Sequence, residues 1–202
     1  MVPAFLLGTS FLFCVLYLEL FRIAEPLIEK HWRRAVPLLV IAMFAVQVLF
    51  VLTVRSSLRQ DHLKIFDAAV ALVEQGGTIG QTHFKNYFMK YPNNIPMCLF
   101  TCVWLKAVEL AGVPRIWWMD AVKIVNILFM NLGFYCTFRL ITRYRSRRRA
   151  ICFLLLTMGF PLWYLLGQMY YKSTNSLAFS MGAVWQYDKA GRQQLSWKKW
   201  TQ

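Results

Sequence analysis

Long apolar runs alternate with short basic connectors along this chain. A helix needs about 20 apolar residues to cross a hydrocarbon core of about 30 Å, and Val36–Val54 approaches that length without a charged residue. The pattern predicts an all-α fold, a polytopic helical bundle of about five or six membrane segments in which residues 1–202 form a single membrane domain. The predicted segments are Pro3–Phe21, Val36–Val54, Ile95–Gly112, Ile116–Leu140, Ile151–Tyr171 (interrupted by Pro161) and Ser176–Tyr187.

The first large loop, residues 55–94, differs because its polar ends enclose an amphipathic stretch. Apolar residues recur at steps of three and four between Leu63 and Val73, which is the period of an α-helix. Asp61 stands where it can cap the start of this helix, and Gly76 where it can end it. We therefore expect an amphipathic helix that lies in the membrane interface.

The segment Ile95–Gly112 holds only a short charge-free core, which favours a helix that enters the membrane and returns to the same side. With that return, the basic stretch 22–34, the arginine-rich stretch 139–149 and the basic C-terminal tail share one side. The positive-inside rule assigns such a side to the cytoplasm, so the 55–94 loop would be extracytoplasmic. An inverted arrangement in which every segment crosses also places most basic residues inside, and both arrangements stay open.

Composition and charge narrow the class of protein. With 58% hydrophobic and 16% charged residues, and a mean hydropathy of +0.43, the chain is too apolar for a disordered protein. A net charge of +14 would indicate nucleic-acid binding in a soluble protein. Beside long apolar runs it is typical of basic loops between spans, so we expect membrane lipids and no nucleic acid as partners. His62 and His83 lack nearby acidic ligands, and we expect no metal and no other cofactor.

The nine acidic residues fall into groups with different expectations. Glu25, Glu29 and Asp188 stand among basic residues and are expected in solvent. Asp61 begins the predicted loop helix, where it can act as a helix cap, as a general base at the mouth of a membrane cavity, or as both. Three acids have a cation three residues away, a spacing that favours helical ion pairs: Glu19 with Arg22, Glu109 with Lys106, and Asp120 with Lys123.

A string from Tyr87 to Pro96 precedes the third apolar segment. Its tyrosines and phenylalanine suit the aromatic belt at a membrane surface. Asn93 and Asn94 favour a turn that leads into the following helix.

The order of these features resembles the N-terminal part of the GT-C glycosyltransferases. The resemblance is carried by Asp61, by the helix sequence Ile65–Ala69 and by the string Tyr91-Pro92-Asn93-Asn94 ahead of a membrane segment. Protein mannosyltransferases and lipid A aminoarabinose transferases are of this type, and the nearest resemblance is to bacterial membrane glycosyltransferases of Gram-positive organisms. It extends over roughly residues 36–187. The string Tyr170–Asn175 lacks the acidic residue that relatives often carry there.

The resemblance implies a glycosyltransferase (a hexosyltransferase) of the bacterial plasma membrane. Such an enzyme moves a sugar from a polyprenyl-phosphate donor to a hydroxyl of a glycan, lipid or protein acceptor, and Asp61 would be its catalytic base. Cations near the loop are candidates for the donor phosphate. The expected substrate-binding residues are Lys64, Lys85, Lys90, Tyr91, Pro92, Asn93, Asn94, Tyr171 and Lys172.

Other functions remain open at this point. Enzymes of this type carry more spans, so the chain is expected to be the N-terminal part of a longer membrane module. One alternative is therefore that the chain is a truncated, non-catalytic relative of such enzymes or an accessory subunit. A small transporter lined by the intramembrane charges is a further alternative.

Overall fold

Helices make up nearly all of the chain that the computed structural model describes. Its backbone covers residues 2–54, 58, 60–76, 78, 84–160, 162–168 and 172–200, and its side chains cover 15–54, 58, 61–76, 78, 84–160, 162–167 and 176–191. These ranges contain no strand, so the all-α expectation is confirmed. In chain order the helices are α1 (Val2–Lys30), α2 (Trp32–Thr53), α3 (Gln60–Gln75), α4 (Lys85–Lys90), α5 (Ile95–Leu110), α6 (Trp118–Tyr144), α7 (Arg147–Gly159), α8 (Leu162–Gln168) and α9 (Lys172–Trp200), with the 3-10 turns η2 (Pro92–Asn94) and η3 (Arg115–Trp117).

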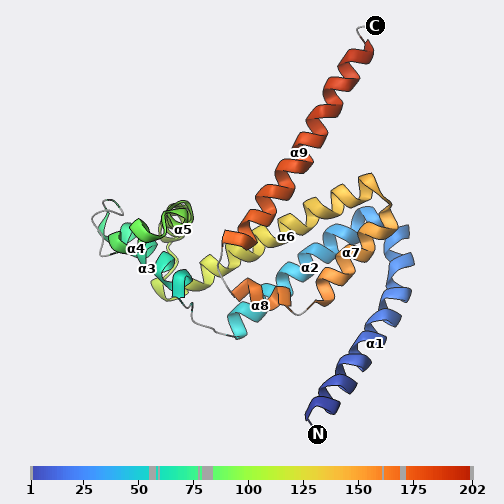
Figure 1. Cartoon of the computed structure of the whole chain (residues 1–202), viewed down its shortest axis with the longest axis horizontal. Helices are drawn as coiled ribbons and strands as arrows, with labels where there is room; N and C mark the ends of the chain where they lie inside the picture. The colour runs from blue at the N-terminus through green and yellow to red at the C-terminus, as the bar shows by residue number, and fades with distance from the viewer. Residues whose placement is uncertain are drawn as a thin grey trace.

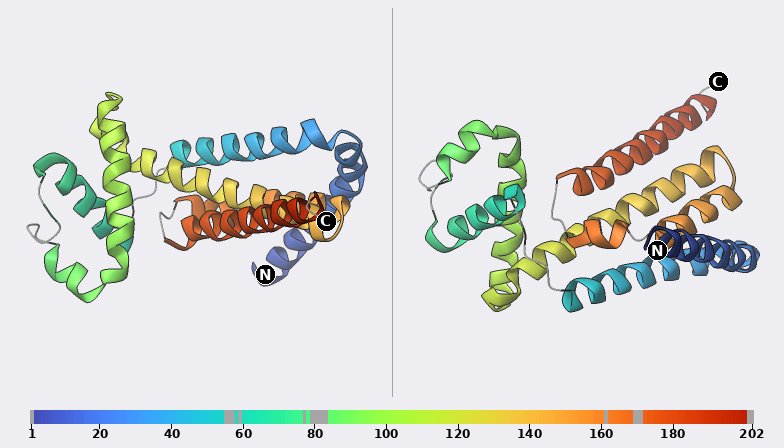
Figure 2. Two further views of the ribbon diagram at one scale, coloured as in Figure 1. Left: turned by 90° about the horizontal axis from the view of Figure 1, so that it is seen from above. Right: turned by 60° about the horizontal axis from the view of Figure 1, so that its bottom comes forward.

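The long helix α6 connects two groups of helices (Figures 1 and 2). Helices α2, α7, α8 and α9 pack against α6, and α1 packs against α7 and α2, while the N-terminal end of α1 and the C-terminal end of α9 extend away from this bundle. Helices α3, α4 and α5 gather at one end of it, which we call the α3–α5 end. The α1–α2 and α6–α7 turns lie together at the other end, which we call the basic end because it carries residues 30–34 and 143–149.

The bundle is held together by apolar contacts and one buried polar pair. Met43 of α2 packs with Met130 and Phe134 of α6, and each of these side chains is at most 2% exposed. Between the same two helices, the Asn131 amide nitrogen donates a 2.5 Å hydrogen bond to the side-chain oxygen of Gln47. A buried pair of this kind favours one register of two helices over others, because a shift leaves the buried side-chain oxygen of Gln47 without its partner.

Helix α3 forms as the sequence predicts, but its surroundings differ from the expectation. It ends at Gln75, before Gly76, whose φ of 69° is one that glycine adopts readily. Its apolar face packs against α5 of the same chain rather than remaining free for the membrane interface. Ala68 and Ala69, both fully buried, allow the two helices to approach closely. The prediction that the membrane interface covers the apolar face of this helix is therefore wrong. The period of apolar residues in a sequence does not reveal which surface covers that face.

Two of the described helical segments, Trp32–Thr53 and Arg115–Tyr144, are long and apolar enough to cross a membrane. The segment expected at Ile151–Tyr171 is divided into α7 and α8, each shorter than a span, with the break at the expected place. Helix α5 lies crosswise to α2 and α6 at one end of the bundle (Figure 2). Whether this segment crosses the membrane or re-enters it stays a prediction. The remaining expected spans fall within α1 and α9, and their number stays a prediction.

Ion pairs confirm some of the sequence expectations and correct others. Lys106 and Glu109 pair at 2.6 Å, and Lys123 and Asp120 approach to 3.9 Å. Among the described side chains, Glu19 and Arg22 form no ion pair.

Two acids that were expected in solvent are held by other helices instead. Glu25 is 6% exposed and lies 3.0 Å from Arg148 of α7. Asp188 of α9 pairs with Arg143 and accepts a 2.5 Å hydrogen bond from the hydroxyl of Tyr144. Both partners come from residues distant in sequence, which single-helix spacing does not reveal.

Candidate functional site

The first turn of α3 presents the proposed base and one of the proposed cations. Asp61 follows Gln60, the first residue of α3, so it belongs to the first turn and is not the cap that was expected. A carboxylate there is favourable because the unpaired N–H groups of the first turn carry partial positive charge. Asp61 is partly exposed and Lys64 is exposed, so both can meet a ligand from solvent.

Helix α4 and the turn η2 bring a tyrosine and an asparagine to the same place. Phe88 is 2% exposed in the α3–α5 core and anchors α4, which leaves the neighbouring Tyr87 at the surface of that core. The side-chain nitrogen of Asn94, itself 4% exposed, donates a 2.7 Å hydrogen bond to the hydroxyl of Tyr87. Asn94 occupies the N-cap position of α5 but makes no cap hydrogen bond, because its amide is directed to Tyr87 instead.

The hydroxyl of Tyr87 also interacts with Asp61. Burial, the largest cause, together with the charge and hydrogen-bonding of the Asp61 carboxylate, raises the pKa of Tyr87 to about 12, while the hydrogen bond from Asn94 acts in the opposite direction. The two neighbours therefore act on the pKa of Tyr87 in opposite directions, Asn94 by donating a hydrogen bond to its oxygen and Asp61 by favouring its protonated form. The Tyr87 hydroxyl thus interacts with both Asn94 and Asp61.

Two lysines and a second tyrosine complete the group, which we call the tyrosine cluster. The ammonium of Lys64 lies 5.0 Å from the centre of the Tyr87 ring, and that of Lys90 lies 5.6 Å from the centre of the Tyr91 ring. The two tyrosine rings are 5.3 Å apart. Cation–π contacts of this length favour placing the positive charges beside the rings. The tyrosine cluster thus comprises Asp61, Lys64, Tyr87, Lys90, Tyr91 and Asn94.

The structure brings together five of the ten expected site residues. Lys85, Pro92 and Asn93 are exposed, and none of the contacts described for the side chains joins them to the tyrosine cluster. Tyr171 and the side chain of Lys172 lie outside the described residues.

Tyr87 was expected only as an aromatic of the membrane surface, yet it is the centre of the tyrosine cluster. Its contact with Asp61 joins segments far apart in sequence. No spacing within the sequence signals such a contact.

A carboxylate beside two ammonium groups can perform two tasks. The carboxylate of Asp61 interacts with the Tyr87 hydroxyl, which leaves its other lone pairs able to accept a proton. Lys64 and Lys90 can stabilise a phosphate or another anion nearby. Within the described residues, no group of three or more His, Cys, Asp or Glu side chains gathers as metal ligands would. The cavities that the structure describes lie at the basic end and not beside Asp61.

Comparisons with known proteins provide no family for this chain. No family model matches it, and neither a curated protein nor a solved structure does so.

Proposed function

We propose that this chain is an integral membrane protein of the GT-C glycosyltransferase type, in which Asp61 is the catalytic base. The observation that supports the proposal best is the interaction of the Tyr87 hydroxyl with both Asn94 and Asp61, with Lys64 alongside. Asp61, Lys64, Lys90, Tyr91 and Asn94 were selected from the sequence and the resemblance, without knowledge of how they meet. Their gathering around one tyrosine is what a shared site requires.

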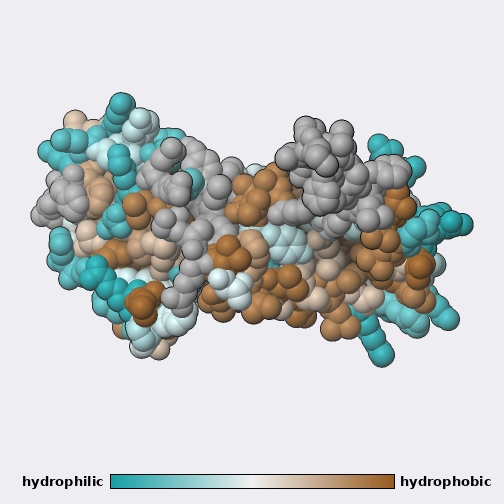
Figure 3. Space-filling model, turned by 90° about the horizontal axis from the view of Figure 1, so that it is seen from below, coloured by the Kyte–Doolittle hydropathy of each residue, from teal (hydrophilic) through white to brown (hydrophobic). Residues whose placement is uncertain are grey.

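The surface of the bundle supports a membrane setting. Only 22% of the apolar window of α2 is buried, and Leu38, Ile41 and Leu49 are each more than 60% exposed. On the face seen in Figure 3, apolar side chains cover the middle of the molecule and hydrophilic ones lie towards both ends. A continuous exposed apolar surface is costly in water and favourable in lipid.

The distribution of charge supports one orientation. The basic clusters before α2 and after α6 lie at the same end of the bundle, opposite to the tyrosine cluster. Under the positive-inside rule the basic end faces the cytoplasm and the tyrosine cluster faces the other side. A polyprenyl-phosphate sugar would be presented to the tyrosine cluster from the outer face of the membrane.

The proposed reaction uses the described groups as follows. Asp61 accepts the proton of the acceptor hydroxyl, whose oxygen forms a bond to the anomeric carbon of the donor sugar. The bond between that carbon and the phosphate oxygen breaks, and the phosphate leaves with the electron pair. Lys64 and Lys90 offset the negative charge that develops on the leaving phosphate. Tyr87 holds the carboxylate in place throughout.

Replacing Asp61 tests the proposal directly. In membranes that contain the full chain, transfer from radiolabelled polyprenyl-phosphate hexoses is expected to disappear in Asp61→Asn. Asp67→Asn is a matched control, because Asp67 is exposed on the same helix and points about 120° away from Asp61 at about 100° per residue. Full activity in Asp61→Asn would refute the role of Asp61. Donor binding without turnover in the wild type would favour a non-catalytic accessory subunit.

Orientation has its own test, because it does not depend on catalysis. A reporter that is active only outside the cytoplasm, fused after Asn94, is expected to be active. A reporter fused between α6 and α7 is expected to be inactive. The reverse pattern would contradict the proposed orientation.

A further inference from the structure

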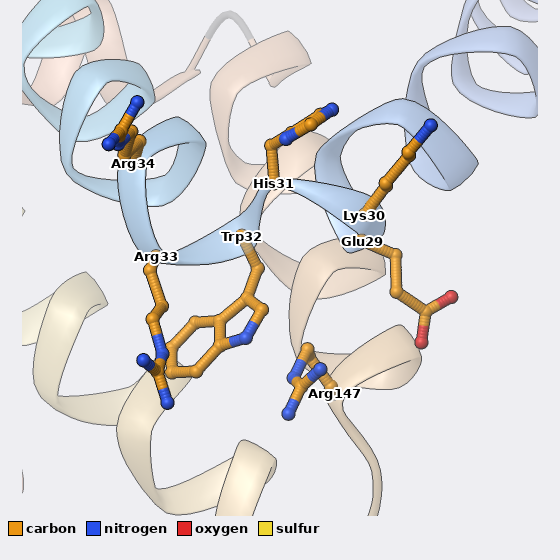
Figure 4. A pocket seen from close by; sticks show the side chains of 7 residues that line it. All are labelled: Glu29, Lys30, His31, Trp32, Arg33, Arg34 and Arg147. Atoms are coloured by element: carbon orange, nitrogen blue, oxygen red, sulfur yellow. The ribbon is translucent and has the colours of Figure 1, made fainter.

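A basic cavity lies at the opposite end of the bundle from the tyrosine cluster. It has a volume of about 460 Å³ and opens beside the turn from α1 to α2 and the start of α7 (Figure 4). Four cationic side chains line it, and Glu29 is the carboxylate among its lining residues. This excess of positive charge favours an anionic occupant. The four cations are Lys30, Arg33, Arg34 and Arg147.

Trp32 organises two of these cations into a pair. The guanidinium carbon of Arg147 lies 4.6 Å from the centre of the Trp32 ring, and that of Arg33 lies 6.0 Å from it. Figure 4 shows both guanidinium groups beside the indole. No carboxylate among the described side chains forms an ion pair with either group. Two free guanidinium groups beside one ring can donate several hydrogen bonds to a phosphate.

A second cavity adjoins the first and has a different character. Its volume is about 240 Å³, and it shares Trp32 and Arg33 with the basic cavity. It extends between α2 and α6 over Val36, Pro37 and Phe138, with Tyr135 and Arg139 also lining it. The Arg139 guanidinium donates a 3.1 Å hydrogen bond to the hydroxyl of Tyr135 and so adds a cation near this groove. The combined space has a cationic mouth and an apolar groove.

We infer that these two adjoining cavities bind an anionic phospholipid. Arg33 and Arg147 hold its phosphate beside Trp32, and the groove between α2 and α6 takes the first part of its acyl chains. Inorganic phosphate would satisfy the two guanidinium groups but leave the groove unused. A zwitterionic lipid would bring its own cation to a mouth that is already positive. Basic pockets between helices at the cytoplasmic surface of a membrane suit anionic head groups for the same reason.

The inference rests on the proposed membrane setting but not on the proposed sugar transfer. Its effect would be structural, since a phosphate held by Arg33 and Arg147 connects the start of α2 to the start of α7. The binding experiment below contains neither donor nor acceptor, so its result is independent of catalysis. The membrane setting has its own test. If an alkaline wash extracted the chain from membranes, that setting would be contradicted whatever the result of the binding experiment.

The experiment uses the full chain purified in a neutral detergent. Binding of dioleoyl phosphatidylglycerol is compared with that of dioleoyl phosphatidylcholine, glycerol phosphate and inorganic phosphate by native mass spectrometry and by the shift in thermal unfolding temperature. Phosphatidylglycerol is expected to bind most tightly. The double variant Arg33→Gln/Arg147→Gln is expected to weaken its binding on the order of tenfold or more, because two charge-assisted contacts are lost.

A matched control has the same loss of charge at the same end of the protein. Arg145 and Arg149 are exposed and line neither cavity, so Arg145→Gln/Arg149→Gln is expected to leave phosphatidylglycerol binding within about twofold of the wild type. If both double variants weakened phosphatidylglycerol binding equally, the proposed site would be overturned, because general electrostatic attraction would explain the binding. Equal affinity for phosphatidylcholine would overturn the role of charge. Equal affinity for inorganic phosphate would overturn the role of the groove and hence the lipid.

Discussion

The side-chain amide of Asn94 donates a 2.7 Å hydrogen bond to the hydroxyl of Tyr87, seven residues earlier in the chain. The Tyr87 hydroxyl also interacts with Asp61, which helps to raise its pKa. The hydrogen bond connects η2 to α4, while the interaction with Asp61 connects α4 to α3. One tyrosine therefore joins three elements, and the consequences of removing its hydroxyl can be measured.

Tyr87→Phe is expected to lower the rate of sugar transfer about 10- to 100-fold without removing it, because Asp61 stays present but loses its orientation. Tyr187→Phe is the control, because Tyr187 is 83% exposed, and it should match the wild type. An unchanged rate in Tyr87→Phe would show that the hydroxyl does not act on Asp61.

Alkaline unfolding provides a second test of the tyrosine cluster. The folded state raises the pKa of Tyr87 from 10.0 to about 12, chiefly through burial and then through Asp61. The unfolded chain therefore releases this proton at lower pH than the folded one. The resulting stability is complete below pH 10 and is lost as pH rises towards 12. Between these values the wild type should lose more free energy of unfolding than Tyr87→Phe in chemical denaturation. Parallel losses in the two proteins would contradict the raised pKa.

Gly133 is a point of close approach between α6 and α9. A Cβ atom added there would lie 2.9 Å from Cγ of Leu177 and 3.1 Å from the backbone nitrogen of Ala178, so the helices would have to separate. Gly133→Ala should lower the free energy of unfolding by about 1–3 kcal/mol. In Gly182→Ala the added methyl has no atom within 4 Å, and the change should raise that energy by about 0.5–1 kcal/mol, since alanine favours a helix. Equal effects in thermal unfolding would show that α6 and α9 do not pack in this way.

The buried amide pair between α2 and α6 can be examined by a double-mutant cycle. Asn131→Leu removes the partner of the buried Gln47 oxygen, and we expect a loss of about 1–3 kcal/mol in the free energy of unfolding. Gln47→Leu/Asn131→Leu removes both amides, together with the buried Gln47 Nε2 and Asn131 Oδ1 atoms that have no partner among the described residues. The double variant should therefore lie within about 1 kcal/mol of the wild type. Additive losses would show that the two amides are not coupled.

Local sequence patterns predicted the helices of this chain more successfully than they predicted which helices pack against one another. The helix around Leu63–Val73, its end at Gly76 and the break near Pro161 follow from residues within a few positions of one another. The covering of α3 by α5 does not, because an apolar face has the same period whether protein or lipid covers it. The pairing of Glu25 with Arg148 was missed for a similar reason, since it connects α1 to α7.

For the candidate site, residue chemistry and chain order selected Asp61, Lys64, Lys90, Tyr91 and Asn94 without indicating how they meet. Only the tertiary structure placed Tyr87 among them, because its contact with Asp61 depends on how α4 packs against α3.

The sequence by itself determined the helical class, the apolar segments and the position of the basic clusters, since each depends on neighbouring residues. The tertiary structure decided that α5 lies across the end of the bundle, that the two basic turns share the other end, and that Trp32 stands between Arg33 and Arg147. These relationships come from packing between distant segments. A helix period contains no information about the partner that a face will meet.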